Sequence, residues 1–398
     1  MDQTVETEKL WTGDFILVGV VNFLIMFIYY QITAILAVYA MNDLGATPSQ
    51  AGLATGMLIV AALIARILTG KFIEEVGRKR TLCIGLAINF AAILLYFLTK
   101  GLPALFFIRI LHGIGFGIST TAAITVVANV VPQARRGEGI GYFALSTTIA
   151  SAVGPSLGIY LYQHSGFSRI LVFAGLTAFA GCITALILKV GEVQLSEIHE
   201  ENLKKLTLSN FFEVKVFPIA IIGFLVFFSY SSIIGFFSAY ATSIELIEAG
   251  SLFFIVYAAA TIISRPFTSR RFDRKGENSV LYPTFIVFAI GLLLLGLAQN
   301  GMTILVSGVF LGVGFGTFVP SGQTIAVNLV KSHRVGVASS TFLAISETGI
   351  GIGPFLLGFL VPVIGYRGLY FCLAGLLLVI FFLYYRLHGR YAALHSQS

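Results

Sequence analysis

The chain repeats its own landmarks at a constant offset of 199 residues, half of its 398-residue length. In the first half the landmarks are segment 66–77, glycines 113, 115 and 117, and Gly154-Pro155; in the second they are segment 265–276, glycines 312, 314 and 316, and Gly353-Pro354. A shared order at one offset is rare by chance, so we infer two fused copies of one unit. Two such halves can move against each other about a central site, as in many transporters.

The composition indicates that both units lie in a membrane. Apolar residues make up 57% of the chain and charged residues only 11%, against roughly 25% charged in a soluble domain. Twelve apolar runs are long enough to cross a bilayer as helices, at 14–41, 48–70, 80–99, 103–131, 139–163, 167–190, 215–242, 247–269, 279–298, 302–330, 337–363 and 367–388. Because these runs do not alternate between apolar and polar residues, they predict helices and exclude a barrel. The expected fold is an all-α membrane protein of two six-helix bundles.

The basic residues predict the orientation. With both termini in the cytoplasm, the inner segments hold 19 of the 25 Lys and Arg residues and the outer loops hold three. This asymmetry follows the positive-inside rule and accounts for the net charge of +7, so the charge gives no reason to expect nucleic-acid binding. The predicted parts are a cytoplasmic tail at 1–13, a bundle at 14–190, a cytoplasmic linker at 191–213, a bundle at 214–388 and a second tail at 389–398.

Signals for metals, disulfides and nucleotide hydrolysis are missing from the sequence. Cys83, Cys182 and Cys372 all fall in predicted helices without CxxC spacing, which is typical of packing residues. No GxxxxGK[ST] loop occurs. We therefore expect no cofactor, no metal and no enzymatic activity.

The loop after the second predicted helix resembles that of the major facilitator superfamily. Gly70, Gly77, Arg78 and Lys79 match the superfamily pattern, and Glu74 replaces its usual Asp. The resemblance covers the whole chain and implies two bundles that alternate between inward-open and outward-open states. It also implies a cytoplasmic latch, in which a carboxylate contacts the start of the eleventh helix. The residues expected in this latch are Gly70, Glu74, Gly77, Arg78, Arg136, Asp273 and Gly276. The alternative is a basic loop that only sets topology.

The fifth predicted helix resembles that of the twelve-helix drug:proton antiporters within this superfamily. The matching residues are Gly141, Gly154, Pro155 and Gly158. Ala150 and Ile159 replace two glycines of the antiporter pattern. Proline should kink this helix, and the kink could serve in opening and closing. The alternatives are tight packing alone or an importer.

One carboxylate lies deep in a predicted helix. Glu347 is ten residues into the run that starts at 337, about 15 Å deep and near the middle of a ~30 Å hydrocarbon core. A carboxylate that is neutral when buried and ionised when wet can carry a proton across. Its first-half equivalent is Thr148, so the group is unrepeated. The alternative is a structural carboxylate that only bonds between helices.

Two basic residues of the fourth helix are further candidates. Arg109 has Gly308 as its second-half equivalent, and His112 lies one turn away. We predict that Arg109 or His112 tunes Glu347, with Asp14 as a reserve proton carrier. The alternatives are an arginine bonded to helix carbonyls and a packed histidine. Arg66 and Arg265 are expected to be structural, snorkelling into the cytoplasmic charges.

Polar and aromatic side chains on the helices that line the cavity in the superfamily are the expected substrate walls. They are Asn22, Tyr30, Gln31, Tyr142, Ser146, Thr147, Phe227, Tyr230 and Gln323, with Phe228, Ser231 and Asn328 nearby. An aromatic pocket with few polar groups suits amphipathic or aromatic compounds. Each of these side chains could instead pack only against a neighbour.

The predicted function is proton-coupled export of a small amphipathic or aromatic compound across a bacterial-type cytoplasmic membrane. The expected partners are this compound, protons and the lipid bilayer, and the expected state is a monomer. A sugar or metabolite transporter, exporter or proton symporter, is the alternative on the same fold. A membrane sensor or scaffold that does not transport is the alternative from another class.

Overall fold

The structure of the protein is a computed structural model, and the description here concerns residues 10–132, 136–189, 212–330 and 335–390. The first bundle is built from α1 (Gly13–Leu44), α2 (Pro48–Val76), α3 (Arg78–Tyr96), α4 (Leu102–Val130) and α5 (Arg136–Ile187). The second contains η3 (Val214–Val216), α7 (Phe217–Ser243), α8 (Ile247–Lys275), α9 (Asn278–Leu297), α10 (Gly301–Asn328), α11 (Val335–Tyr384) and η5 (Tyr385–Gly389). The described part holds ten helices that are long and apolar enough to cross a membrane.

The two longest helical segments each consist of two helices joined at a kink where the chain reverses. α5 has 52 residues and α11 has 50, about 75 Å each if straight and more than twice a ~30 Å hydrocarbon core. Each contains one glycine in the left-handed region, Gly166 with φ 73° and Gly365 with φ 69°, where a residue with a Cβ would be strained. These glycines are 199 residues apart, so the reversal belongs to the repeat.

Hydrogen bonds to α1 confirm the reversal in α5. Before Gly166, the Tyr162 hydroxyl donates to Asp43 in the last turn of α1 at 2.8 Å. After the reversal, the backbone N–H of Lys189 donates to Asp14 in the first turn of α1 at 2.9 Å. The chain thus runs the length of α1 and returns. Two crossings in each of α5 and α11 would give the expected twelve, a number that stays a prediction.

Packing between helices also repeats at the 199-residue offset. A Cβ on Gly113 would overlap the carbonyl of Leu58, and one on Gly312 would overlap the carbonyl of Tyr257. Because both members of each pair are shifted by 199 residues, the same α2–α4 contact is rebuilt as the α8–α10 contact. Glycine at these positions lets the two backbones approach closely. The two halves are therefore alike in three dimensions as well as in sequence.

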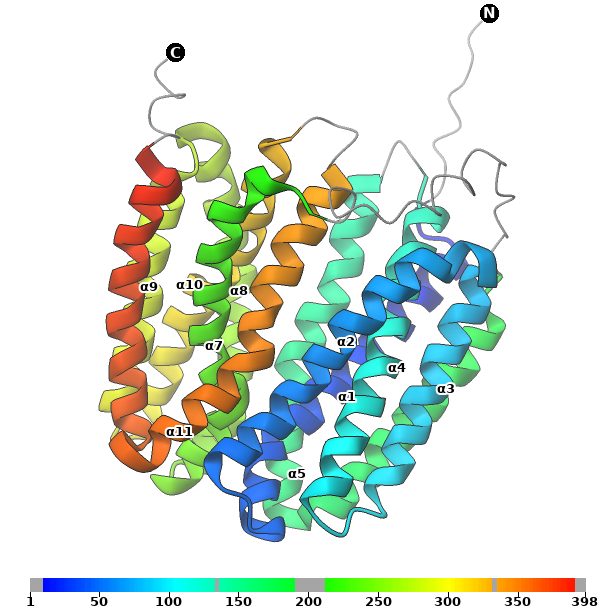
Figure 1. Ribbon diagram of the computed structural model, residues 1–398, viewed down its shortest axis with the longest axis horizontal. Helices are drawn as coiled ribbons and strands as arrows, with labels where there is room; N and C mark the ends of the chain where they lie inside the picture. The colour runs from blue at the N-terminus through cyan, green and yellow to red at the C-terminus, as the bar shows by residue number, and fades with distance from the viewer. Residues whose placement is uncertain (1–9, 133–135, 190–211, 331–334, 391–398) are drawn as a thin grey trace, which may run out of the picture.

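The halves lie side by side and meet through α2 with α11, α5 with α8, and α1 with α7. In Figure 1, α2 and α11 come together toward the lower end and separate toward the upper end, where α1 begins. A Cβ on Gly52 would overlap the carbonyl of Pro354, and the Ser49 hydroxyl donates to the carbonyl of Phe355 at 3.4 Å. Backbone contact between the halves is thus built at the end opposite the start of α1.

Candidate functional site

An ion pair joins the two halves. The Arg66 guanidinium of α2 pairs with the Glu347 carboxylate of α11, and the side chains are 28% and 22% exposed. The guanidinium carbon also lies 5.8 Å from the ring centroid of Phe116, within cation–π range. The expectation that Arg66 snorkels into the cytoplasmic charges is wrong. The arginine lies ten residues before the end of α2 and its charged partner is Glu347.

Arg109 is fully buried and held by the first bundle. Its Nε donates to the carbonyl of Ala54 at 2.8 Å, one terminal nitrogen donates to the carbonyl of Thr55 at 3.1 Å, and the other donates to the Tyr96 hydroxyl at 3.3 Å. These partners correspond to the alternative of an arginine bonded to helix carbonyls. Ala54 and Thr55 precede Gly56, whose Cβ position meets the carbonyl of Gly351 in α11. Arg109 therefore fixes α2 just behind the contact between the halves.

His112 lies beside Arg109 rather than beside Glu347. Its Nδ1 lies 3.3 Å from the Tyr96 hydroxyl, and its buried Nε2 has no hydrogen-bond partner among the described residues. The charged partner that the structure gives Glu347 is Arg66, which the sequence analysis missed. Glu347 stood out in the sequence because it is not repeated, but nothing in the sequence identified Arg66 as its partner.

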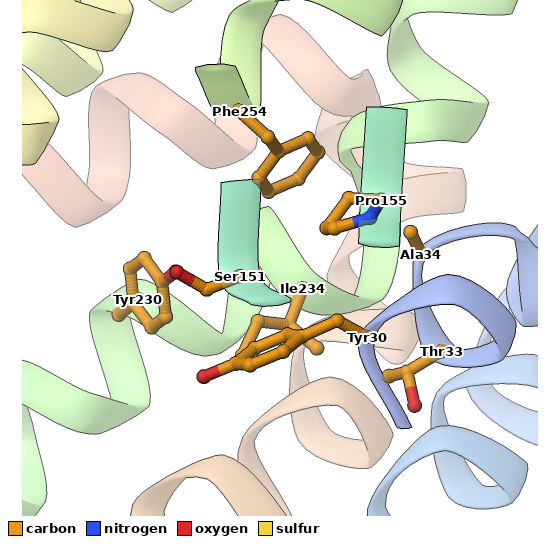
Figure 2. Close-up of a pocket in the computed structure, with 8 residues that line it drawn as sticks. All are labelled: Tyr30, Thr33, Ala34, Ser151, Pro155, Tyr230, Ile234 and Phe254. Atoms are coloured by element: carbon orange, nitrogen blue, oxygen red, sulfur yellow. The ribbon is translucent and has the colours of Figure 1, made fainter. Parts of the chain in front are cut away.

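A small cavity lies where α1, α5, α7 and α8 meet, as Figure 2 shows. Side chains from both halves line it, namely Tyr30, Thr33, Ala34, Ser151, Pro155, Tyr230, Ile234 and Phe254. Its volume of about 10 Å³ is close to what one water molecule needs, so a larger ligand requires the walls to separate. Tyr30 and Tyr230 were expected here. Pro155 belongs to the helix-five motif, whereas the other apolar and small wall residues gave no signal in the sequence.

The other expected substrate residues are distributed over several places. The Asn22 amide donates to Ser146 at 2.7 Å and to Thr147 at 3.0 Å, which joins three of them in the first bundle. The Gln323 amide instead donates to Ser339 in α11 at 2.8 Å. Neither group lines the cavity between the halves.

Three further residues have different surroundings. Both polar side-chain atoms of Gln31 are buried without a hydrogen-bond partner among the described residues. The ring of Phe227 packs on Phe315 with centroids 5.0 Å apart. Tyr142 is 41% exposed and packs on Trp11 near the start of α1, away from the cavity.

The helix-five motif shapes the contact of α5 with α1. A Cβ on Gly154 would lie 3.0 Å from the Phe27 carbonyl, and one on Gly158 would lie 3.3 Å from the Gln31 Cα. Pro155 lines the cavity. The surroundings of Gly141 lie outside what the structure describes, so its role in the motif stays a prediction.

The expected cytoplasmic latch is only partly described. Gly77 (φ 94°) and Gly276 (φ 75°) make equivalent turns after α2 and α8, where glycine tolerates the positive φ. Gly70 has open space at its Cβ position, and Asp273 is exposed. Arg78 begins α3 and has a contact partner. The side chains of Glu74 and Arg136 lie outside the described residues, and so does most of the predicted linker, 191–211.

Comparisons with known proteins agree with this architecture. A family model described as Major Facilitator Superfamily matches residues 17–246 and 219–396. An uncharacterised MFS-type transporter of Methanocaldococcus jannaschii is 25% identical over 85% of this chain and 89% of its own. The staphylopine export protein of Staphylococcus aureus is 23% identical over 90% and 93%. Multidrug resistance protein 2 of Bacillus subtilis is 21% identical over 78% and 80%.

Solved structures share the fold at low sequence identity. A crystal structure of the nucleoside transporter NupG matches with a TM-score of 0.75 and 14% identity, over 94% of this chain and 99% of its own. A POT family transporter in complex with a thioalcohol-conjugated peptide matches with a TM-score of 0.79 and 16% identity, over 94% and 96%.

Proposed function

Because this chain belongs to the major facilitator superfamily, we propose that it is a proton-coupled exporter that works by alternating access. Its cargo would be a small amphipathic or aromatic compound that leaves across a bacterial-type cytoplasmic membrane. The similarity to a staphylopine export protein and to a multidrug resistance protein supports export. The observation that carries the proposal is the Arg66–Glu347 ion pair between the halves.

The pair links a proton to the position of the halves. A proton on Glu347 neutralises the carboxylate and removes its attraction for Arg66. Conversely, α2 and α11 placed as they are here hold the guanidinium and the carboxylate in contact. With both termini cytoplasmic, the halves touch at the outer end and this is an inward-facing arrangement. A proton taken up from outside would then be released to the cytoplasm as the pair forms.

The proton gradient can supply the energy for export. Each charge that crosses 100 mV is worth about 2.3 kcal/mol, to which the pH difference adds. The walls of the cavity come from α1 and α5 of the first half and from α7 and α8 of the second. Rocking of the halves would therefore widen it. Its aromatic walls, Tyr30, Tyr230 and Phe254, suit an apolar or aromatic cargo.

The test is transport by the purified protein in vesicles that hold a pH-sensitive dye. A panel of aromatic acids, neutral compounds and cations would be screened for compound-dependent proton movement in the wild type. Glu347→Gln keeps the shape of the side chain and removes its titration, so we expect binding without gradient-driven accumulation. Glu248→Gln is the matched control, because Glu248 is an exposed carboxylate in the first turn of α8. Accumulation by Glu347→Gln with the pH dependence of the wild type would exclude Glu347 as the coupling group.

A further inference from the structure

The ion pair between the halves is present on only one side of the repeat, among the residues that the structure describes. Arg265 of α8 is the counterpart of Arg66, and Thr148 of α5 is the counterpart of Glu347, each shifted by 199 residues. The α5–α8 contact likewise repeats the α11–α2 contact. The second arginine therefore lies on an equivalent helix that crosses an equivalent partner, but the partner offers a short neutral side chain in place of a carboxylate.

Arg265 has no counter-ion within the described ranges of the chain. Its Nε is buried and has no hydrogen-bond partner, and no acidic side chain among the described residues forms an ion pair with it. Asp273, an acid toward the cytoplasmic end of α8, is eight residues away and exposed. Arg109, by contrast, reaches three acceptors. Arg265 is half-buried rather than sealed off, and among the described residues it has no counter-ion, so its guanidinium is available to an anionic ligand.

Helix geometry places Arg265 on the face of α8 that lines the cavity. Phe254, a cavity wall, is eleven residues earlier in the same helix. Eleven residues at 3.6 per turn bring a side chain back to within about 20° of the same direction. On α5, Thr148 lies one turn from Ser151, which is another wall of the cavity. The Ser151 hydroxyl donates a hydrogen bond to the backbone carbonyl of Thr148 at 2.8 Å. Both members of the incomplete pair thus continue the cavity walls toward the end where α1 begins.

We propose that Arg265 binds the carboxylate of the transported compound, which is an organic acid with an apolar body. The ligand's carboxylate takes the place that Glu347 fills in the other half, where the planar guanidinium can accept it in a two-bond arrangement. The apolar body of the ligand points from Arg265 toward the cavity walls Tyr30, Tyr230 and Phe254. The backbones of Phe254 and Arg265 are about 16 Å apart along α8. This inference rests on the proposed export function and narrows its substrate class.

The experiment measures equilibrium binding to the purified protein without a pH gradient. The probes are acids with their neutral amides: 2-naphthoate and 2-naphthamide, indole-3-acetate and indole-3-acetamide, hexanoate and hexanamide. We expect at least one acid to bind, and its amide to bind about 10- to 100-fold more weakly, which is the range of one charged hydrogen-bonding contact. Binding of no acid, or equal binding of acids and amides, would overturn the inference.

Variants locate the contact. Arg265→Gln should weaken acid binding about 10- to 100-fold and leave amide binding unchanged. Arg270→Gln removes the same charge from an exposed position of α8 and should bind as the wild type does. Thr148→Glu keeps the arginine but gives it an internal carboxylate, so it should also lose acid binding. Undiminished acid binding by Arg265→Gln, or by a folded Thr148→Glu protein, contradicts the assignment.

One comparison separates this inference from the export proposal. Glu347→Gln should keep the wild-type preference for the acid over its amide, because Glu347 belongs to the other half and a shift between the two arrangements changes the affinities for acid and amide by the same factor. Gradient-driven transport by Glu347→Gln would reject the coupling mechanism and leave the Arg265 site intact. If Arg265→Gln loses the preference for the acid over its amide and Glu347→Gln keeps it, the Arg265 site is confirmed whatever the direction of transport.

Discussion

Breaking the Arg66–Glu347 pair should shift the protein toward an arrangement that is open at the outer end. The two side chains are 28% and 22% exposed, so the pair is intermediate between surface pairs, worth about 0–1 kcal/mol, and fully buried ones, where losing one partner costs about 3–5 kcal/mol. Two unit charges about 4 Å apart attract by about 4 kcal/mol at an effective dielectric constant of about 20. Solvent screens part of this attraction, and desolvating the two charged groups offsets another part. The pair should therefore stabilise the present arrangement by roughly 1–3 kcal/mol, which is about 5- to 150-fold in the equilibrium between the two arrangements.

Labelling of a single cysteine would measure this equilibrium. Cys83, Cys182 and Cys372 are replaced first, and Ser49→Cys then reports outer opening, because Ser49 is 8% exposed and contacts Phe355 across the halves. At a pH where both groups are charged, Arg66→Gln and Glu347→Gln should each speed labelling by an impermeant thiol reagent.

The double variant decides whether the two residues act as a pair. If they do, Arg66→Gln with Glu347→Gln should label no faster than the more affected single variant, because the second change has no interaction left to remove. Additive effects of the two substitutions, or single variants that label as the parent does, would refute the reasoning.

Three further outcomes are expected. Gly56→Leu would drive a side chain into the carbonyl of Gly351, so the cysteine of Ser49→Cys should be labelled faster and transport should be lost at normal expression. Gly375→Leu, with open space at its Cβ position, should change neither the labelling nor the transport. Arg109→Ala should lower the thermal unfolding temperature, because three acceptors lose a charged donor at roughly 1–3 kcal/mol each; an unchanged unfolding temperature would argue against a structural Arg109. Cysteines at Lys100 should react with impermeant reagents from outside intact cells and those at Lys275 should not, and the reverse pattern would invert the predicted orientation.

Much of the architecture could be predicted because it depends on periodic properties of the chain. Apolar runs must form helices in lipid, where each backbone group needs an internal partner. The repeat also predicted equivalent glycines in the two halves, such as Gly77 with Gly276 and Gly154 with Gly353. In α5 and α11 the sequence predicted two runs each, and the structure has two helices joined at a kink in each, at Gly166 and at Gly365.

The site was harder to predict because it depends on pairs of residues far apart in the chain. Glu347 stood out as the one deep carboxylate, but its partner lies 281 residues away. Arg109 looked more unusual than Arg66, since it has no counterpart in the second half. In the fold Arg109 is satisfied within its own bundle, while the repeated Arg66 meets Glu347.

The sequence by itself determined the membrane location, the two-fold repeat and the chemical groups available in the helices, since these follow from composition and spacing alone. The tertiary structure decided which of those groups meet. The angle at which α2 crosses α11, set by backbone contact at Gly52 and Gly56, brings Arg66 to Glu347, whereas the equivalent crossing of α8 and α5 has Thr148 in place of a carboxylate. A charge in a protein acts through its distance to other charges, and that distance between helices of different halves is not encoded in any local pattern.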